Sequence, residues 1–448
     1  MNFLLHHTTA KYFMEGLWRD EAFSWAMASR GLDLLPLTAR DFNPPLYYLL
    51  LYGWMSMFGT SEHAMRSLSL LFYAGTLWIV WRFMRDLVDV PAPRAVLYMA
   101  LFALNPVLSY FAVEARMYSM LAFCAAGSFY AYVARKPGVY VLSTTAGLFT
   151  HYFMILVVLT QLLSAFLERD GRAPLRRRVF LLGVPLLLFA PWLAITLSSR
   201  GGVGFWTDPP GWRFGMHLVT SIYTGHDATY GFLDRPERWA YAAILIPLVA
   251  WALRAVLGAT REKRSVLILV ALWALVPPVL VFAATLLKPV FVPRYLIFST
   301  VGLVLLLVAG IERARPRARV VSMAVLCALA VHYQALQAQR HSKGQYRETV
   351  NAIREQAGPQ DVLYVRNELD FFPAQYYFDP DRVFIYGRRL EQIPPYVGKV
   401  LIPESVVVRE MAAPPVRVFM LKNHGEFVKV AAPAWTGAVR TPRHAYGR

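Results

Sequence analysis

The sequence predicts an α-helical polytopic membrane protein of about 10–11 spans, with a small α/β domain at its C-terminal end. Of the 448 residues, 57% are hydrophobic and only 17% are charged, a composition too apolar for a soluble protein of this length. Apolar runs of membrane length recur until the sequence changes character after Gln337. We therefore expect a first external loop with juxtamembrane helices (1–61), a transmembrane domain (62–336) and an external α/β domain (337–448).

The apolar runs give the expected positions of the membrane helices. We expect them near residues 62–86, 95–110, 118–134, 138–152, 153–168, 179–197, 239–257, 265–287, 295–311 and 320–336. Residues 45–59 are apolar but short for a span, so we expect a helix that lies along the membrane interface. Tyr47 and Tyr48 in this helix would then be interfacial anchors.

The basic residues predict the topology. The net charge of +18 comes largely from clusters in alternate loops, which the positive-inside bias assigns to the cytoplasm. These clusters are Arg82, Arg85 and Arg94; Arg135 and Lys136; Arg169, Arg172, Arg176, Arg177 and Arg178; Arg254, Arg261, Lys263 and Arg264; and Arg313, Arg315, Arg317 and Arg319. The remaining loops, including 198–238 and the tail, would be external. Membrane topology explains this charge better than nucleic-acid binding, which we do not expect.

The tail of the chain has a different sequence pattern from the apolar runs before it. From Tyr346 to Gly387 the sequence alternates an amphipathic helix, an apolar strand, a second helix and a second strand, which is the pattern of a small α/β domain.

Cys124 and Cys327 each lie inside an apolar run, so neither a disulfide framework nor a thiolate metal site is expected.

Three carboxylates in the first external loop are candidate catalytic residues, because a carboxylate beside a bilayer is costly unless it is solvated or paired. Asp20 and Glu21 are adjacent, and Asp41 precedes a Pro-Pro pair that starts the interfacial helix. The structural alternative is that Asp20 caps a helix over residues 22–28. Phe23 occupies the position where a capping box would have Glu or Gln, and the sequence leaves capping and catalysis equally open.

Ionisable and aromatic residues also occur at the external ends of the later spans. "VEARMY" supplies Glu114, Arg116 and Tyr118, and "LLKPVFVPRY" supplies Lys288 and Arg294. External cations run against the positive-inside bias, so an anion would account for them. The alternative is pairing between helices. His151 is a weaker candidate, since a lone histidine near an interface is more often a structural residue.

Four stretches, in this order, resemble the GT-C superfamily of polytopic glycosyltransferases. They are "LWRDEAF", "DFNPPLYYLLLYGWMSMFGTSEHAMRSLS", "LSYFAVEARMYSML" and "FVPRYLI". The similarity is greatest to the bacterial branch related to protein O-mannosyltransferases and to the lipid A aminoarabinose transferase. It covers roughly residues 15–310, and the ordered set is specific although each motif alone is weak.

The resemblance implies transfer of a sugar from a polyprenyl-phosphate donor to a glycan, lipid or protein acceptor at the external face. It places Asp20 and Glu21 at the catalytic centre, matches Asp41 to an acidic family position, and matches Arg116 and Arg294 to basic positions that would hold the donor phosphate with help from Lys288. A single in-line displacement would invert the anomeric carbon. Asn43 stands where the aminoarabinose branch has a lysine.

Further expectations follow from the resemblance. We expect no obligatory metal, although some members bind a divalent metal at such carboxylates. We expect an integral protein of the bacterial inner membrane, in contact with membrane lipids, with its active site and C-terminal domain extracytoplasmic. Because the family has a membrane helix ahead of the Asp-Glu loop, we expect a truncated start, with a short divergent N-terminus as the alternative. A polytopic lipid or glycan transporter, or a non-catalytic scaffold, are the rival functions.

Overall fold

A computed structural model of the protein describes residues 7–167, 174–199, 212–225, 234–412, 416–421 and 427–430. Arg169, Arg172 and parts of the predicted external loop 198–238 lie outside these residues. The chain divides into two compact units. One, here called the membrane unit, contains the described residues up to Glu15 and within Ser24–Lys343. The other, here called the C-terminal unit, contains Gly16–Phe23 and the described residues from Gly344 onward.

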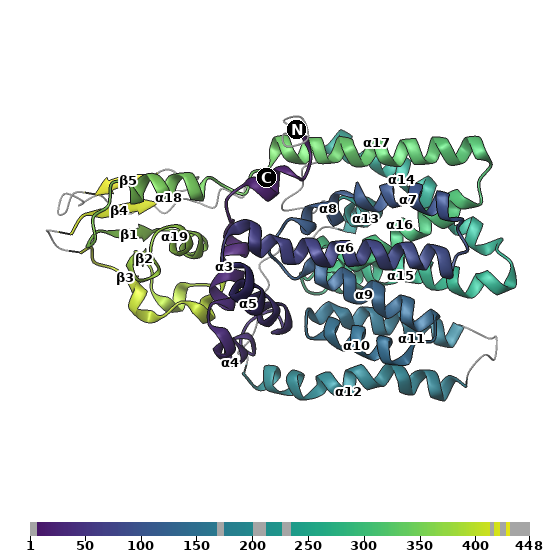
Figure 1. The fold of residues 1–448 in the computed structure, drawn as a ribbon, viewed down its shortest axis with the longest axis horizontal. Helices are drawn as coiled ribbons and strands as arrows, with labels where there is room; N and C mark the ends of the chain where they lie inside the picture. Colours follow the sequence, from purple (N-terminus) through teal and green to yellow (C-terminus); the bar gives the residue numbers. More distant parts are fainter. Residues whose placement is uncertain are drawn as a thin grey trace. The chain divides into compact units, whose positions relative to one another are not determined.

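The membrane unit is a bundle of apolar helices (Figure 1). It starts with the short α2 (Lys11–Met14), the later part of α3 (Arg19–Ala28), α4 (Leu34–Thr38) and α5 (Leu46–Phe58). The bundle follows as α6 (Glu62–Asp86), α7 (Ala92–Ala103), α8 (Pro106–Ala112), α9 (Tyr118–Val133), α10 (Pro137–Leu148), α11 (Ile155–Leu167), α12 (Leu175–Ser199), α13 (Leu218–Thr224), α14 (Arg235–Leu257), α15 (Arg261–Thr285), α16 (Ile297–Glu312) and α17 (Pro316–Arg340). A helix is therefore present at each of the ten predicted membrane positions, which confirms the polytopic helical class.

The helices differ in length more than the sequence predicts. Within the described residues six helices are long and apolar enough to cross a membrane, and α7 with α8 would make a seventh. Those two are bent by 73°, because the Asn105 side chain caps the N–H groups of Val107 and Leu108 at 3.1 Å each and Pro106 starts a new helix. The helices α9, α10 and α11 are shorter than a full span, because turns at Lys136 and His151 interrupt their apolar runs.

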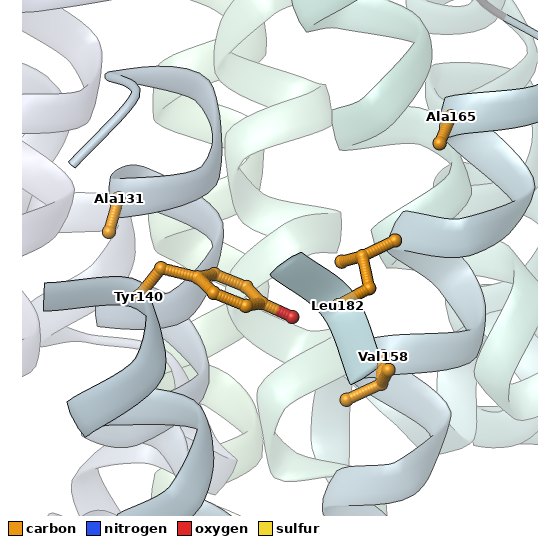
Figure 2. Packing of buried hydrophobic residues seen from close by; sticks show 5 residues of the cluster. All are labelled: Ala131, Tyr140, Val158, Ala165 and Leu182. Atoms are coloured by element: carbon orange, nitrogen blue, oxygen red, sulfur yellow. The ribbon is translucent and has the colours of Figure 1, made fainter. Parts of the chain in front are cut away.

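The core of this bundle is α16, in which every residue from Ile297 to Ile311 is buried. Gly302 allows the neighbouring helix to approach closely, since a Cβ there would lie 2.8 Å from Cγ of Trp273. Farther along the bundle, α9 to α12 pack through Ala131, Tyr140, Val158, Ala165 and Leu182 (Figure 2). These contacts hold α9 to α12 together as one packed group.

A short polar chain links the same group of helices. The Tyr140 hydroxyl donates to Gln161 at 3.1 Å, and the Gln161 amide donates to Ser128 at 2.9 Å. Ser128 also exchanges a hydrogen bond of 2.8 Å with Thr144. Because apolar surroundings offer these groups no water, the bonds favour one packing of α9, α10 and α11.

The prediction that Tyr47 and Tyr48 are interfacial anchors is wrong. Both side chains are fully buried on the inner face of α5. The Tyr47 hydroxyl lies 3.4 Å from the Ser69 hydroxyl of α6, and the Tyr48 hydroxyl accepts a hydrogen bond from Arg116. The hydroxyls find protein partners rather than lipid headgroups, so these tyrosines belong to the packing around Arg116.

The C-terminal unit is built on a five-stranded sheet of order β3-β2-β1-β4-β5. Its strands are β1 (Val362–Val365), β2 (Val383–Tyr386), β3 (Val407–Val408), β4 (Val418–Leu421) and β5 (Phe427–Val430), with α18 (Tyr346–Arg354) before β1 and α19 (Phe371–Tyr377) between β1 and β2. The first four strands are parallel and β5 is antiparallel to β4. This arrangement confirms the predicted small α/β domain.

The segment Gly16–Phe23 is part of the C-terminal unit, although the 320 residues of Ser24–Lys343 separate it from the rest of that unit along the chain. The N–H of Leu17 donates to the Tyr377 hydroxyl at 2.6 Å. The Phe23 and Phe372 rings meet edge to face at 5.5 Å, and Gly398 packs against both. The predicted Asp-Glu loop is thus held by hydrogen bonds and aromatic contacts of the tail.

Candidate functional site

Arg116 lies in the turn between α8 and α9 and is buried, with 7% of its surface exposed. Its guanidinium donates to the hydroxyls of Ser24 and Tyr48 at 3.3 and 3.4 Å. The Ser69 hydroxyl donates to the Arg116 carbonyl at 3.3 Å, which anchors the backbone as well. Three helices therefore orient one cation at this end of the bundle.

Tyr118 connects Arg116 to Arg294, which reaches the site from the turn before α16. The Arg116 guanidinium lies 5.9 Å from the centre of the Tyr118 ring, and Nε of Arg294 donates to the Tyr118 hydroxyl at 3.1 Å. Tyr295 stacks on Tyr118 with centroids 6.2 Å apart and lies beneath Arg294 at 5.7 Å. The aromatic rings provide favourable surroundings for two neighbouring cations.

His151 belongs to the same cluster. It lies in the turn between α10 and α11, with its ring 4.9 Å from Tyr295 and 6.3 Å from Tyr118. Its Nδ1 accepts a hydrogen bond of 3.2 Å from the N–H of Phe153, so the proton of the neutral ring is on Nε2. Burial, followed by the charges of Arg116 and Arg294, lowers the pKa of His151 to about 3. The ring is therefore neutral near pH 7 and offers one N–H donor.

Glu114 is fully buried beside this cluster and pairs with a residue that the sequence analysis did not single out. Lys343, also buried, places Nζ 3.9 Å from the Glu114 carboxylate and 3.4 Å from the carbonyl of Val113. Its ammonium also lies over the rings of Tyr110 and Tyr12 at 5.6 and 6.0 Å. Lys343 falls in a polar stretch 229 positions beyond Glu114, so sequence spacing carried no signal of the pairing.

The other two predicted residues of the membrane unit differ in exposure. Lys288 is exposed in the turn after α15, unlike the buried Arg116 and the half-buried Arg294. Asp41 is buried ahead of α5, on the same segment of chain as Tyr48, and its N–H donates to the carbonyl of Thr38 at 3.2 Å. The structure thus brings together Arg116, Tyr118, His151 and Arg294, with Glu114 in the adjoining turn.

Asp20 and Glu21 lie in the C-terminal unit, in the first turn of α3. The structural alternative, in which Asp20 caps a helix over residues 22–28, does not hold, because α3 begins at Arg19 and Asp20 is already helical. Instead the buried Glu21 carboxylate accepts a hydrogen bond of 3.4 Å from the N–H of Trp18, while Asp20 is half-buried. Glu21 thereby satisfies a helix-end donor, and Asp20 does not serve as the N-cap.

Asp20 is held in place through its neighbour Arg19. The Arg19 guanidinium donates to Asp370 through Nη2 at 2.8 Å and through Nε at 3.1 Å. The Tyr346 hydroxyl donates to the same carboxylate oxygen at 2.7 Å and accepts from Arg19 at 3.0 Å. Asp370 follows β1, so the sheet fixes the backbone that carries Asp20.

The arrangement offers two kinds of chemistry. The membrane-unit cluster has two guanidinium groups and a neutral imidazole donor among aromatic rings, which suits an anion such as a phosphate. The segment in the C-terminal unit presents carboxylates, which suit proton acceptance. Within the described residues, no group of three His, Cys, Asp or Glu side chains is arranged to hold a metal ion.

The bundle of apolar helices with an added α/β unit has the GT-C fold. A crystal structure of apo ArnT from Cupriavidus metallidurans matches with a TM-score of 0.62 at 15% identity, covering 94% of this chain and 91% of that one. A second structure of that protein, bound to undecaprenyl phosphate, gives 0.60 at 15% identity over 93% and 91%. An Archaeoglobus fulgidus oligosaccharyltransferase tethered to an acceptor peptide gives 0.49 at 11% identity over 77% and 55%. No family model matches the sequence, and no curated protein matches it either.

Proposed function

We propose that this protein is a membrane glycosyltransferase that moves a sugar from a polyprenyl-phosphate donor to an acceptor hydroxyl on the extracytoplasmic side. The observation that carries the proposal is the cluster of Arg116, Arg294, Tyr118 and neutral His151 at one end of an apolar bundle. A lipid phosphate in a membrane has its charge at the level of such helix ends, where two guanidinium groups can neutralise it. The fold shared with ArnT, one structure of which holds undecaprenyl phosphate, supports the same donor class.

The proposed roles divide between leaving group and nucleophile. Arg116 and Arg294, with Lys288 assisting from its exposed turn, hold the donor phosphate. The acceptor hydroxyl gives its proton to Asp20 while its oxygen bonds to the anomeric carbon and the bond from that carbon to the phosphate oxygen breaks. The phosphate departs with both bonding electrons, and stabilisation of this charge lowers the barrier. Such a displacement inverts the anomeric centre.

Glu21 and Asp41 have supporting roles in this proposal. The Glu21 carboxylate accepts a hydrogen bond from the N–H of Trp18. In this way Glu21 orients the start of α3, which carries Asp20. Asp41 is the reserve base. The proposal includes no obligatory metal and leaves the acceptor as a glycan, a lipid or a protein.

Binding of undecaprenyl phosphate to the purified protein tests the donor site. Arg294→Ala should weaken binding by about 10–100-fold, since a hydrogen bond to a charged group contributes about 1.5–3 kcal/mol. Arg294→Lys should recover only part of it, because lysine keeps the charge but not the planar fork. Arg254→Ala removes an exposed cation from the last turn of α14 and serves as the control. Equal binding by Arg294→Ala and the wild type would place the phosphate elsewhere.

A second measurement separates a transferase from a transporter. In proteoliposomes containing a radiolabelled polyprenyl-phosphate sugar, a transferase releases polyprenyl phosphate and passes the label to an acceptor, and NMR of the product gives the anomeric configuration. A transporter moves the intact donor between leaflets. Movement without cleavage, in the presence of a cell-envelope extract as acceptor source, would contradict the proposed transfer.

A further inference from the structure

Two ion pairs lie at opposite edges of the parallel sheet in the C-terminal unit, and they differ in how many hydrogen bonds reach the carboxylate. At the amino ends of β1 and β4, Arg417 donates to Asp361 through Nε at 2.9 Å and through its backbone N–H at 3.0 Å, and the N–H of Gly358 donates to the same carboxylate at 2.5 Å. These bonds lower the pKa of Asp361, with the Arg417 side chain as the largest cause. This pair is complete and serves the fold.

The pair at the carboxyl edge is incomplete. Glu368 follows β1 and Arg388 follows β2, and their nearest charged atoms are 3.6 Å apart. Glu368 is buried to 8% exposure, yet no hydrogen bond reaches its Oε2 from the described residues. A buried carboxylate oxygen without a donor costs free energy, and an O–H group of a ligand would supply that donor.

This pair lies beyond the carboxyl ends of the strands, at the edge of the sheet where open α/β sheets bind ligands. The order β3-β2-β1-β4-β5 means that the chain leaves β1 on one side for β2 and later returns on the other side as β4. Ligands bind such sheets beyond the carboxyl ends of the strands, near the point where this direction reverses. The reversal lies between β1 and β4; Glu368 follows β1 and borders it, whereas Arg388 follows β2, one strand away.

The same edge leads to the proposed base. Asp370, two residues beyond Glu368, binds the side chain of Arg19 at 2.8 Å, and Asp20 is the next residue of that segment. Glu368 and Asp20 therefore belong to segments of one compact unit that the Arg19–Asp370 pair joins.

We infer that the carboxyl edge of β1 and β2 is a binding site for a neutral polyol, namely the sugar hydroxyls of a glycan-type acceptor, with Glu368 accepting from one hydroxyl and Arg388 donating to another. This inference deepens the proposed function and rests on it, since the term acceptor presupposes that the protein transfers a sugar. Glu368 and Arg388 offset each other's charge, so the site favours hydroxyl groups over an anion, which the buried carboxylate would repel. A phosphate-bearing ligand is the competing occupant.

Binding of soluble probes to the purified full-length protein tests this site without requiring transfer. Saturation-transfer NMR with maltotriose as the neutral polyol and inorganic phosphate as the anion should detect maltotriose only. Glu368→Gln and Arg388→Ala should each weaken maltotriose binding at least fivefold. Arg389→Ala, the same charge change one residue away, should leave it unchanged. Thermal unfolding of each variant shows whether the fold is retained.

Three results would overturn the inference: phosphate binding in place of maltotriose, unchanged maltotriose binding by folded Glu368→Gln and Arg388→Ala, or an equal loss in Arg389→Ala. Loss of maltotriose binding in those variants, with undecaprenyl phosphate binding retained, supports it. Failure of sugar transfer with maltotriose binding intact would count against the proposed function alone.

Discussion

The membrane unit and the C-terminal unit concentrate opposite charges at their candidate functional residues. In the membrane unit Arg116 and Arg294 lie among aromatic rings, and a neutral His151 adds a donor. In the C-terminal unit the candidate residues are carboxylates: Glu368 follows β1, and Asp20 is the neighbour of Arg19, which binds Asp370. Under the proposed function, this difference assigns anion binding to one unit and hydroxyl recognition and proton acceptance to the other.

Asp20 and Asp41 test this division most directly, since Asp20 belongs to the C-terminal unit and Asp41 to the membrane unit. Asp20→Asn should lower turnover by about 10²–10⁴-fold, the usual worth of general base assistance, because the amide cannot take the proton. Undecaprenyl phosphate binding should stay unchanged. Initial rates of sugar transfer and a donor-binding measurement on the same preparation check both points.

The matched variant is Asp41→Asn. It should reduce turnover much less than Asp20→Asn does. The reverse order would move the base into the membrane unit and break the division, and normal turnover by both variants would remove the catalytic role from this stretch of chain.

The buried pair of Lys343 and Glu114 tests what holds the cationic cluster together. Lys343→Met should lower the stability of the protein by about 3–5 kcal/mol, because it leaves a buried carboxylate without its cation. The double variant Lys343→Met, Glu114→Gln should recover part of this loss. Thermal unfolding in one detergent measures these two variants and the single variant Glu114→Gln. Additive losses in the double variant would show that the two residues, 3.9 Å apart, are not coupled.

Gly398 tests how tightly the C-terminal unit holds the segment that carries Asp20. Its φ of +82° disfavours any side chain, and a Cβ would lie 2.5 Å from Phe23 and 2.9 Å from Phe372. Gly398→Ala should therefore destabilise the unit by about 1–3 kcal/mol. Gly387 has a similar φ of +77° with no atom within 4 Å of its Cβ position, so Gly387→Ala isolates the backbone strain. Equal losses in the two variants would mean that the Phe23 contact contributes nothing.

The sequence was sufficient for the helices and for much of the cationic cluster. Apolar run length and alternating basic loops locate helices. Arg116, His151 and Arg294 lie in connections between helices, and Tyr118 is the first residue of α9. Periodicity does not say whether an aromatic faces lipid or protein, which is why Tyr47 and Tyr48 were misplaced.

Pairings between residues far apart in the chain could not be predicted from the sequence, for a physical reason. The pairs Lys343 with Glu114 and Arg19 with Asp370 join residues more than 200 positions apart. Such contacts depend on how separate elements pack, and no local propensity encodes them. Arg19 had no special signal beyond standing next to Asp20.

The smallest expected effect concerns pH and His151. Because the pKa of this histidine is lowered to about 3 in the folded protein, from about 6.5 when unfolded, the unfolded chain binds the proton first as pH falls. The stabilisation is therefore present above about pH 6.5 and is lost progressively toward pH 3. Between pH 7 and pH 5.5 the loss of stability should be about 1 kcal/mol.

The variant His151→Gln tests this expectation. Glutamine cannot titrate, so the thermal unfolding of the variant should shift less over this window than that of the wild type. His341, whose pKa is lowered to about 4 mainly by burial and then by Lys343 and Lys11, titrates in both proteins and cancels in the difference. Identical pH profiles for the two proteins would mean that the pKa of His151 is not lowered, and that the ring is not buried beside Arg116 and Arg294 as the structure places it.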